Sequence, residues 1–262
     1  MDPLYDKERK LEQKLEEMED VLVAFSGGVD STYLLFKTKE KAKGRVVAVT
    51  AISPLHPLKE IEEAKTRAKE LGMEHILLES KELESAEFRA NPPHRCYLCR
   101  RIVYGDFKGV AEKKGLRYVL IGNNRDDEEK ARPGMRAAVE YEIHSPLQEV
   151  ELRKNDIRQL SKEAGLPTHD KPALPCLVTR FRYGEQLTLP KLEQVERSEE
   201  YLHLLGFKKL RVRYHGDIAR LELEGSMMEK ALEMRKEIRT VLQKLGFTYV
   251  TLDFTSDLEE KE

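Results

Sequence analysis

A short glycine-containing segment is the first part of this 262-residue chain whose residue types can carry chemistry. The hexapeptide Ser-Gly-Gly-Val-Asp-Ser at residues 26–31 follows an apolar run at 21–25 and precedes a helical pattern. Glycines let the backbone approach an anion, and the free N–H groups of a helix start favour phosphate. No lysine follows the glycines, which excludes the loop type that holds β- and γ-phosphates with Lys-Ser/Thr. The segment predicts a pyrophosphate-binding turn, and an ordinary strand–turn–helix corner is the alternative.

The hexapeptide resembles the pyrophosphate-loop signature of the ATP pyrophosphatases, which cleave ATP between the α- and β-phosphates. The resemblance implies that Ser26, Gly27, Gly28, Asp30 and Ser31 bind ATP. Asp30 is placed to hold Mg²⁺ against the phosphates, although a helix-capping carboxylate is a second interpretation of the same residue. The motif is specific for ATP-to-AMP chemistry and says little about the acceptor.

The three cysteines form the second chemical group. Cys96 and Cys99 are one helical turn apart, and Cys176 follows much later in a proline-rich loop. A zinc site would take His94 or His169 as its fourth ligand. A redox pair would leave Cys176 without a role, and a three-cysteine iron–sulfur cluster would leave one iron open. Unrelated buried thiols are the fourth interpretation.

Composition excludes several classes of protein. With 46 basic and 48 acidic residues the net charge is −2, which argues against extended nucleic-acid binding. The apolar runs are too short for a membrane span, and the charged start is not a signal peptide. An odd number of cysteines fits a reducing compartment better than a disulfide framework. We therefore expect a cytoplasmic protein with no membrane partner.

Strands and helices alternate over the first 170 residues. The predicted strands are residues 21–25, 45–51, 74–79, 117–123 and 144–147, and the predicted helices are 5–18, 32–41, 58–71, 98–114 and 155–165. This alternation predicts an α/β fold, a parallel sheet with flanking helices. The ATP pyrophosphatase resemblance implies its Rossmann-like, adenine nucleotide alpha-hydrolase-like form. Ligands bind beyond the carboxyl ends of such strands, which brings the loop at Gly122 to the ATP site.

The pattern changes beyond this region. We expect residues 1–170 to form the ATP-binding domain, 171–186 a junction loop that contains Cys176, and 187–262 a small α+β domain for substrate phosphate or oligomerisation. In the small domain the predicted helices are 188–205 and 226–245, and the predicted strands are 208–214, 218–223 and 247–254.

Two arginines on the first strand of the small domain form a candidate phosphate site. Arg211 and Arg213 are two residues apart, so both side chains leave the same face of the strand. Leu210, Val212 and Tyr214 can then pack inward on the other face. Paired guanidinium groups suit a substrate phosphate, and a solvated charged face is the alternative.

Four longer motifs resemble the sulfur transferases of nickel-pincer nucleotide synthesis, the LarE family. They are residues 91–99, 171–184, 211–220 and 246–253, so the resemblance covers almost the whole chain. It implies an ATP-dependent sulfur transferase that adenylates carboxylates of a pyridinium mononucleotide and converts them to thiocarboxylates. It also implies a homo-oligomer.

The resemblance also gives the cysteines their roles. One branch of the family sacrifices a single sulfur, which corresponds to Cys176, and another holds a [4Fe–4S] cluster on three cysteines. This chain has Cys96, Cys99 and Cys176, so the resemblance implies the cluster branch with Cys176 as a catalytic ligand. Apart from the resemblance, Arg180 and Arg182 follow Cys176 closely, and their charges predict that they neutralise the adenylate, with Arg180 binding ATP, or the carboxylates of the pyridinium. The sequence does not indicate which sulfide source reloads the cluster.

Two other functions compete with this one. A tRNA thiolation enzyme would use the same adenylate chemistry, but the net charge of −2 and the small C-terminal domain disfavour it. A zinc-stabilised nucleotide-binding protein without turnover is the rival from another class, and ATP–pyrophosphate exchange separates it from the enzymes. Asp126, Glu199 and Glu200 are weaker candidates for metal or orientation roles.

Overall fold

The chain forms two compact units. The computed structural model describes residues 3–129, 134–172 and 175–254. The first unit comprises Met1–Phe88 and Pro93–Leu174, and the second comprises Arg89–Pro92 and Pro175–Glu262. The second unit thus takes four residues from the middle of the chain. Ala173 and Leu174, which belong to the motif at 171–184, lie outside the described residues.

The first unit is built on a four-stranded parallel sheet. Its strands are β1 (Glu19–Ala24), β2 (Lys43–Ile52), β3 (Glu74–Glu79) and β4 (Tyr118–Leu120), in the order β3-β2-β1-β4. The four strands predicted at these places are confirmed. The sheet order reverses at β1, so the loop after this strand lies at the position where parallel α/β sheets bind ligands.

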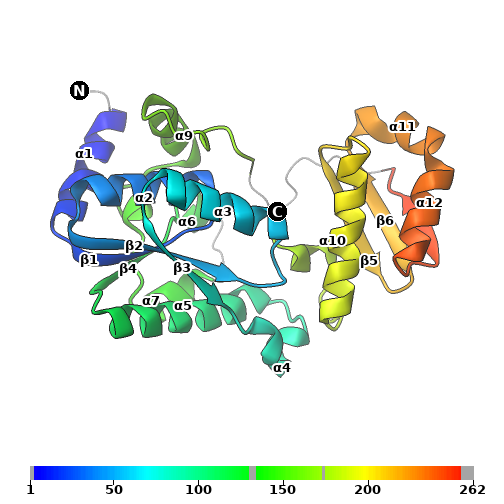
Figure 1. Ribbon diagram of the computed structural model, residues 1–262, viewed down its shortest axis with the longest axis horizontal. Helices are drawn as coiled ribbons and strands as arrows, with labels where there is room; N and C mark the ends of the chain where they lie inside the picture. Colours follow the sequence, from blue (N-terminus) through cyan, green and yellow to red (C-terminus); the bar gives the residue numbers. More distant parts are fainter. Residues whose placement is uncertain (1–2, 130–133, 173–174, 255–262) are drawn as a thin grey trace. The chain divides into compact units, whose positions relative to one another are not determined.

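Helices cover both faces of this sheet. The helices in this part of the chain are α1 (Pro3–Glu16), α2 (Val29–Lys41), α3 (Leu58–Glu70), α4 (Ala86–Arg89), α5 (Arg95–Lys114), α6 (Arg125–Glu129), α7 (Met135–Glu140), α8 (Pro146–Glu149) and α9 (Lys154–Glu163), with a 3₁₀ turn at Glu82–Glu84. Figure 1 shows α2 and α3 on one face and α5 and α7 on the other. The predicted α/β fold class is confirmed.

The apolar run of β1 is continuous because the strand is buried on both faces. Val21 and Val23 pack into the core that includes α1, α2 and α9, whereas Leu22 packs into the core that includes α5 and α7. Adjacent side chains of a strand point to opposite faces, so a strand between two helical layers needs apolar residues at every position. This double burial fixes the end of β1 and therefore the start of the glycine loop.

The strand predicted at residues 144–147 is wrong. His144 makes a single parallel bridge to Leu120, and the chain then enters the short helix α8. Pro146 explains the difference, because proline has no N–H to continue a strand ladder and is favoured at the start of a helix.

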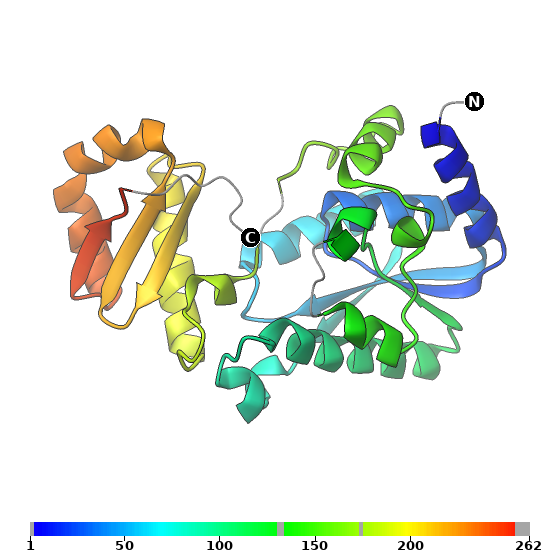
Figure 2. The same ribbon diagram turned by 180° about the vertical axis from the view of Figure 1, so that it is seen from behind.

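The second unit has a three-stranded sheet of its own. β5 (Leu210–His215) pairs antiparallel with β6 (Ile218–Leu223), and β6 pairs parallel with β7 (Tyr249–Leu252). Helix α10 (Leu189–Leu204) packs on β5, and a 3₁₀ turn at Leu177–Arg180 precedes it in the chain. Figure 2 shows β5 and β6 in front of α10, so the face that carries no helix is turned toward the reader.

The single helix predicted at 226–245 is divided in the structure. A 3₁₀ turn at Gly225–Met227 leads into α11 (Met228–Glu233), and after Met234 the chain continues as α12 (Arg235–Lys244). A straight 20-residue helix would be about 30 Å long, whereas a six-residue strand extends about 20 Å. The break lets both halves bury apolar residues, Ala231 in α11 and Ile238 and Leu242 in α12.

Candidate functional site

The glycine loop connects β1 to α2 and is closed by its own serines. Ser26 Oγ and Ser31 Oγ lie 3.1 Å apart, and Ser31 Oγ also donates to the Gly28 carbonyl at 3.2 Å. Gly27 has a φ of +68°, the left-handed region that favours glycine. The Ser26 and Ser31 hydroxyls are therefore engaged within the loop, and they hold its shape.

Asp30 lies in the first turn of α2 and is not the helix cap. Gly28 is the N-cap, and no side chain caps the helix. Asp30 Oδ2 lies 2.6 Å from Lys154 Nζ and accepts a longer bond from Asn124 Nδ2 at 3.4 Å. Oδ1 is buried and accepts no hydrogen bond within the described residues. Burial raises the pKa of Asp30, and the Lys154 ammonium opposes that shift.

This geometry suits the cation role of Asp30. A carboxylate with one oxygen paired and the other buried without a donor has a lone pair left for a hard cation. The α2 amides of Val29, Asp30 and Ser31 precede the first helical hydrogen bond, which Thr32 N donates to the Gly28 carbonyl at 2.9 Å. Such early amides are the donors that bind phosphate at a helix start.

Sequence reasoning missed two lysines that contact the loop. Lys154 begins α9, 124 positions after Asp30, and Lys171 Nζ donates to the Gly27 carbonyl at 3.1 Å while pairing with Glu63 at 2.8 Å. A signal for Lys154 was available, because a cation in the first turn of a helix opposes the helix dipole and calls for a nearby anion. The two lysines supply the positive charge that the loop itself lacks.

Asp126 supports Lys154 from the loop after β4. Its Oδ1 pairs with Arg153 Nη1 at 2.7 Å, and its Oδ2 accepts the backbone N–H of Lys154 at 2.9 Å. Both carboxylate oxygens are thus used at the start of α9. Of the two roles considered for Asp126, metal binding and orientation, the structure supports orientation.

Cys96 and Cys99 lie in the first turns of α5. Cys96 is exposed, and Cys99 is half-buried with its thiol donating to Glu82 Oε1 at 3.7 Å. Both belong to the first unit, and Cys176 belongs to the second. In the part of the chain that the structure describes, no three His, Cys, Asp or Glu side chains gather as metal ligands. The convergence of all three cysteines therefore stays a prediction.

Cys176 begins the 3₁₀ turn at Leu177–Arg180 and is half-buried. Its carbonyl accepts hydrogen bonds from the backbone N–H of Thr179 at 3.1 Å and from Thr179 Oγ1 at 2.9 Å. The loop beyond it is joined to the motif at 91–99, since Asn91 Nδ2 donates to the Arg182 carbonyl at 2.7 Å. The Gly184 N–H also donates to the Asn91 carbonyl at 2.9 Å.

Arg180 is buried in an ion pair with Glu199. Its Nε and Nη2 donate to the two oxygens of Glu199 at 2.8 and 2.9 Å, and Arg180 is 7% exposed. Nη1 donates to the Pro175 carbonyl at 3.2 Å, and Glu199 also accepts the Val212 N–H at 2.8 Å. These bonds join the Cys176 loop to α10 and β5 through Arg180 and Glu199, and the contact of Arg180 with the adenylate stays a prediction.

Arg211 and Arg213 share a face of β5, as the alternation predicted, but they differ in their partners. Leu210, Val212 and Tyr214 are buried on the opposite face. Arg213 pairs with Glu222 at 2.9 Å and donates to the Thr179 carbonyl at 2.6 Å. Arg211 makes no hydrogen bond or ion pair through its side chain among the described residues. Burial, then the charges of Arg213 and Arg180, lower the pKa of Arg211.

Comparisons with known proteins identify the family. Residues 3–131 match the PP-loop domain family. Over 255 residues the chain is 38% identical to the pyridinium-3,5-bisthiocarboxylic acid mononucleotide synthase of Lactiplantibacillus plantarum, with 97% of this chain and 92% of that protein covered. The chain belongs to the LarE family. It is also 39% identical to an uncharacterized protein of Synechocystis sp., with 95% and 94% covered. An uncharacterized protein of Methanocaldococcus jannaschii is 28% identical, with 93% and 94% covered.

Membership of the LarE family confirms the resemblance that the four motifs carried, and the PP-loop match confirms the glycine loop as part of an ATP-using domain. The iron–sulfur branch of the family and the roles of individual residues stay predictions. Within the described residues, none of the helices is both long and apolar enough to cross a bilayer.

Gly122 packs directly on the PP-loop of this LarE protein. A Cβ at this position would lie 2.9 Å from Ser31 N and 3.2 Å from the Asp30 carbonyl carbon, both backbone atoms. We expect Gly122→Ala to push the loop after β4 away from α2. The expected result is ATP binding weakened about ten-fold or more and unfolding free energy lowered by about 1–3 kcal/mol, measured by calorimetric titration and chemical denaturation.

Gly109 provides the matched control for this prediction. It lies in α5, and a Cβ there meets nothing within 4 Å. Gly109→Ala should stabilise the protein by about 0.5–1 kcal/mol and leave ATP binding unchanged. Equal ATP affinities for Gly122→Ala and the parent would contradict the packing role of Gly122.

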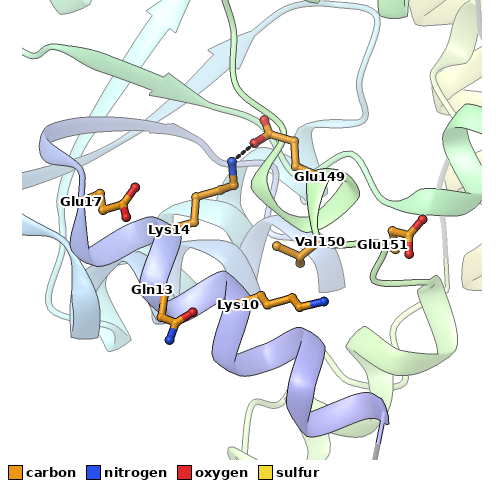
Figure 3. A pocket seen from close by; sticks show the side chains of 7 residues that line it. All are labelled: Lys10, Gln13, Lys14, Glu17, Glu149, Val150 and Glu151. Atoms are coloured by element: carbon orange, nitrogen blue, oxygen red, sulfur yellow. Dashed lines mark ion pairs between the residues drawn. The ribbon is translucent and has the colours of Figure 1, made fainter.

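A hollow in the first unit is not lined by the glycine loop. It has a volume of about 420 Å³ and is lined by Lys10, Gln13, Lys14, Glu17, Glu149, Val150 and Glu151. Figure 3 shows Lys14 of α1 reaching Glu149 of α8, with an ion-pair distance of 2.5 Å. None of the predicted site residues lines this hollow, and we assign it no role.

Proposed function

We propose that this ATP-dependent sulfur-transferring enzyme converts carboxylates of a pyridinium mononucleotide into thiocarboxylates, a step of nickel-pincer nucleotide synthesis. The relative from Lactiplantibacillus plantarum is named for a pyridinium-3,5-bisthiocarboxylic acid mononucleotide. The observation that carries the proposal is the Asp30 carboxylate of the PP-loop, whose buried Oδ1 accepts no hydrogen bond within the described residues. The match to this synthase over 97% of the chain supports it. We further propose a cytoplasmic homo-oligomer.

The first half-reaction activates the carboxylate. A carboxylate oxygen of the substrate attacks the α-phosphorus of ATP, the bond to the β-phosphate oxygen breaks, and pyrophosphate leaves with its electron pair. Asp30 would hold Mg²⁺ through its buried Oδ1, while the early amides of α2 and the ammonium groups of Lys154 and Lys171 would bind the departing pyrophosphate. The product is an acyl adenylate.

The second half-reaction replaces AMP by sulfur. A sulfur nucleophile attacks the carbonyl carbon, a C–S bond forms, and AMP leaves with the electrons of the C–O bond. We propose that Cys176 would hold the sulfur donor at this step and keep its own sulfur, so that no thioester to Cys176 has to be broken. The Arg180–Glu199 pair and the Thr179 hydrogen bonds would hold the Cys176 backbone at one position beside β5. Water must be kept from the adenylate until sulfur reacts, because hydrolysis would return the starting carboxylate.

We also propose that Cys96, Cys99 and Cys176 hold a [4Fe–4S] cluster. The donor chemistry fits, since none of the three cysteines is in a disulfide and iron–sulfur clusters are held by cysteine thiolates. The hydrogen bonds of Asn91 support it, because they join the segment that leads to Cys96 to the segment that follows Cys176. A bound cluster would offer a sulfide on its open iron as a donor that can be renewed.

The function is tested by incubating the purified protein with ATP, Mg²⁺, sulfide and a pyridinium mononucleotide that carries ring carboxylates. We expect AMP and pyrophosphate to form together with a product in which sulfur has replaced a carboxylate oxygen, detected by mass spectrometry. ATP hydrolysis that depends on tRNA instead would favour the tRNA thiolation alternative. ATP binding without pyrophosphate exchange would favour the zinc-stabilised, non-catalytic protein.

A further inference from the structure

His215 is a basic residue on the open face of the second sheet that the proposed function does not use. It is the last residue of β5, and strand alternation places it on the same face as Arg211 and Arg213. Phe181 forms a parallel bridge to Tyr214, so the chain that follows Cys176 runs beside β5. Figure 2 shows that no helix crosses β5 or β6 on the face turned to the reader.

Both ring nitrogens of His215 are buried and without a hydrogen-bond partner among the described residues. A neutral imidazole has one N–H donor and one acceptor nitrogen, and leaving either unmade in a buried position costs free energy. Buried polar atoms without a hydrogen-bond partner are rare in folded proteins. A bound ligand would supply the missing partner, and the charges around His215 indicate which kind of ligand fits.

The neighbours of His215 are cationic. The charges of Arg182, Arg220 and Arg213 act on its ring, with Glu222 as the opposing carboxylate, and burial followed by these arginines lowers the pKa of His215. Its imidazole is therefore neutral in this setting, with an N–H to donate.

Two of these arginines are already compensated. Arg213 pairs with Glu222 at 2.9 Å, and Arg220 pairs with Glu222 at 2.9 Å and with Asp253 at 3.1 Å. Arg182 and Arg211 make no ion pair within the described residues. The face thus carries four guanidinium groups against two carboxylates, with the uncompensated charge on Arg182 and Arg211. An anion at this face would meet the charges of Arg182 and Arg211 and the ring N–H of His215.

We propose that His215 is a ligand for a phosphate monoester, to which it donates a ring N–H while Arg211 and Arg182 neutralise the charge. On the proposed function, this phosphate is that of the pyridinium mononucleotide, so the inference names a further binding residue for the same substrate. It also divides the arginine pair of β5, since Arg211 contacts the phosphate and Arg213 holds the Cys176 loop through the Thr179 carbonyl.

The first test uses inorganic phosphate and the full-length protein. The ring nitrogens of ¹⁵N-labelled histidine are followed by NMR, and the His215 signals are assigned by their loss in His215→Gln. Phosphate should shift the His215 nitrogens and leave those of His203 unmoved, because His203 Nδ1 is already within 2.8 Å of the Phe207 carbonyl. His215 nitrogens that respond neither to inorganic phosphate nor to a mononucleotide would overturn the proposal.

The second test separates the phosphate from the rest of the substrate. Calorimetric titration compares nicotinate mononucleotide with its nucleoside, nicotinate riboside, for the parent and for His215→Phe. We expect His215→Phe to bind the mononucleotide about ten-fold more weakly and the riboside equally well. His215→Asn and His215→Gln each place an amide N–H near one ring nitrogen, so the variant that recovers binding identifies the donor. His203→Gln is the control.

The two hypotheses can fail separately. A parent that thiolates the mononucleotide, together with a His215→Phe variant that binds it normally, would overturn the role of His215 and keep the function. A parent whose His215 shifts with inorganic phosphate, but which neither binds nor thiolates a pyridinium mononucleotide, would keep the anion site and reject the substrate.

Discussion

Replacing Asp30 by alanine should lower AMP formation by roughly two to three orders of magnitude, the usual loss when a preorganised electrostatic group at the reacting phosphate is removed. The variant loses the buried Oδ1 that we propose for Mg²⁺ and leaves Lys154 without its partner at 2.6 Å. Lys154→Met should produce a loss of similar size, because the ammonium would no longer compensate the leaving pyrophosphate. The measurement is ATP–pyrophosphate exchange and AMP release at saturating substrate.

Arg153→Met is the matched control. Arg153 precedes Lys154 at the start of α9 and pairs with Asp126 at 2.7 Å. The arginine side chain of this pair is about half exposed, and ion pairs of this kind contribute little to stability. The rate of ATP–pyrophosphate exchange should therefore fall by less than about three-fold. If Lys154→Met exchanges pyrophosphate as fast as the parent, its pairing with Asp30 is structural only. Unchanged exchange in Asp30→Ala would remove the PP-loop assignment of that residue.

The fold of the first unit could be predicted because its signals are local. The apolar run of β1, the glycines after it and the helical pattern of α2 are adjacent in the sequence, and each depends on burial and turn chemistry that single residues specify. The error at 144–147 has the same origin. His144 does continue the sheet by one bridge, but Pro146 ends the ladder. The prediction followed the apolar residues of this segment and gave too little weight to the proline.

The site was harder to predict because its contacts are distant in sequence. Lys154 meets Asp30 across 124 positions, and no periodicity links a lysine on one helix to an aspartate on another. Arg180 shows the same limit. An arginine four residues after Cys176 suggests a ligand contact, but its Nε and Nη2 donate to Glu199 on α10, a partner 19 positions away that the sequence does not reveal. A sequence shows the charge of a side chain but not whether a partner has already neutralised it.

Arg211 and Arg213 also show that a sequence does not reveal which charged side chains are already paired. They are identical residues two positions apart, and alternation correctly places them on one face. Their difference comes from β6, where Glu222 pairs with Arg213 and leaves Arg211 uncompensated. Arg213 also donates to the Thr179 carbonyl, so it already has two partners. Assigning the phosphate to Arg211 and the Cys176 loop to Arg213 leaves both of these contacts in place.

The prediction with the largest effect concerns the cysteines. Cys176→Ser should abolish sulfur transfer and leave ATP–pyrophosphate exchange near the parent level, because Asp30 and the PP-loop belong to the other half-reaction. If a cluster on three thiolates is the sulfur donor, Cys96→Ser and Cys99→Ser should also lose repeated turnover with added sulfide. Anaerobic purification, an absorption spectrum and iron and sulfide counts measure the cluster directly, and each of the three variants should lose it.

Histidine variants separate the cluster from a zinc site. His94 Nε2 lies 3.5 Å from Glu87 with its side chain 55% exposed, and His169 Nδ1 lies 3.0 Å from the Leu166 carbonyl. A zinc site that needs a fourth ligand would lose its metal in His94→Gln or His169→Gln, whereas a three-thiolate cluster would keep its iron in both. If Cys96→Ser and Cys99→Ser instead transfer one sulfur per chain and Cys176 loses its own sulfur, Cys176 is the sacrificed donor. That result would place the chain in the other branch of its family, with the same adenylation chemistry but an enzyme consumed by a single turnover.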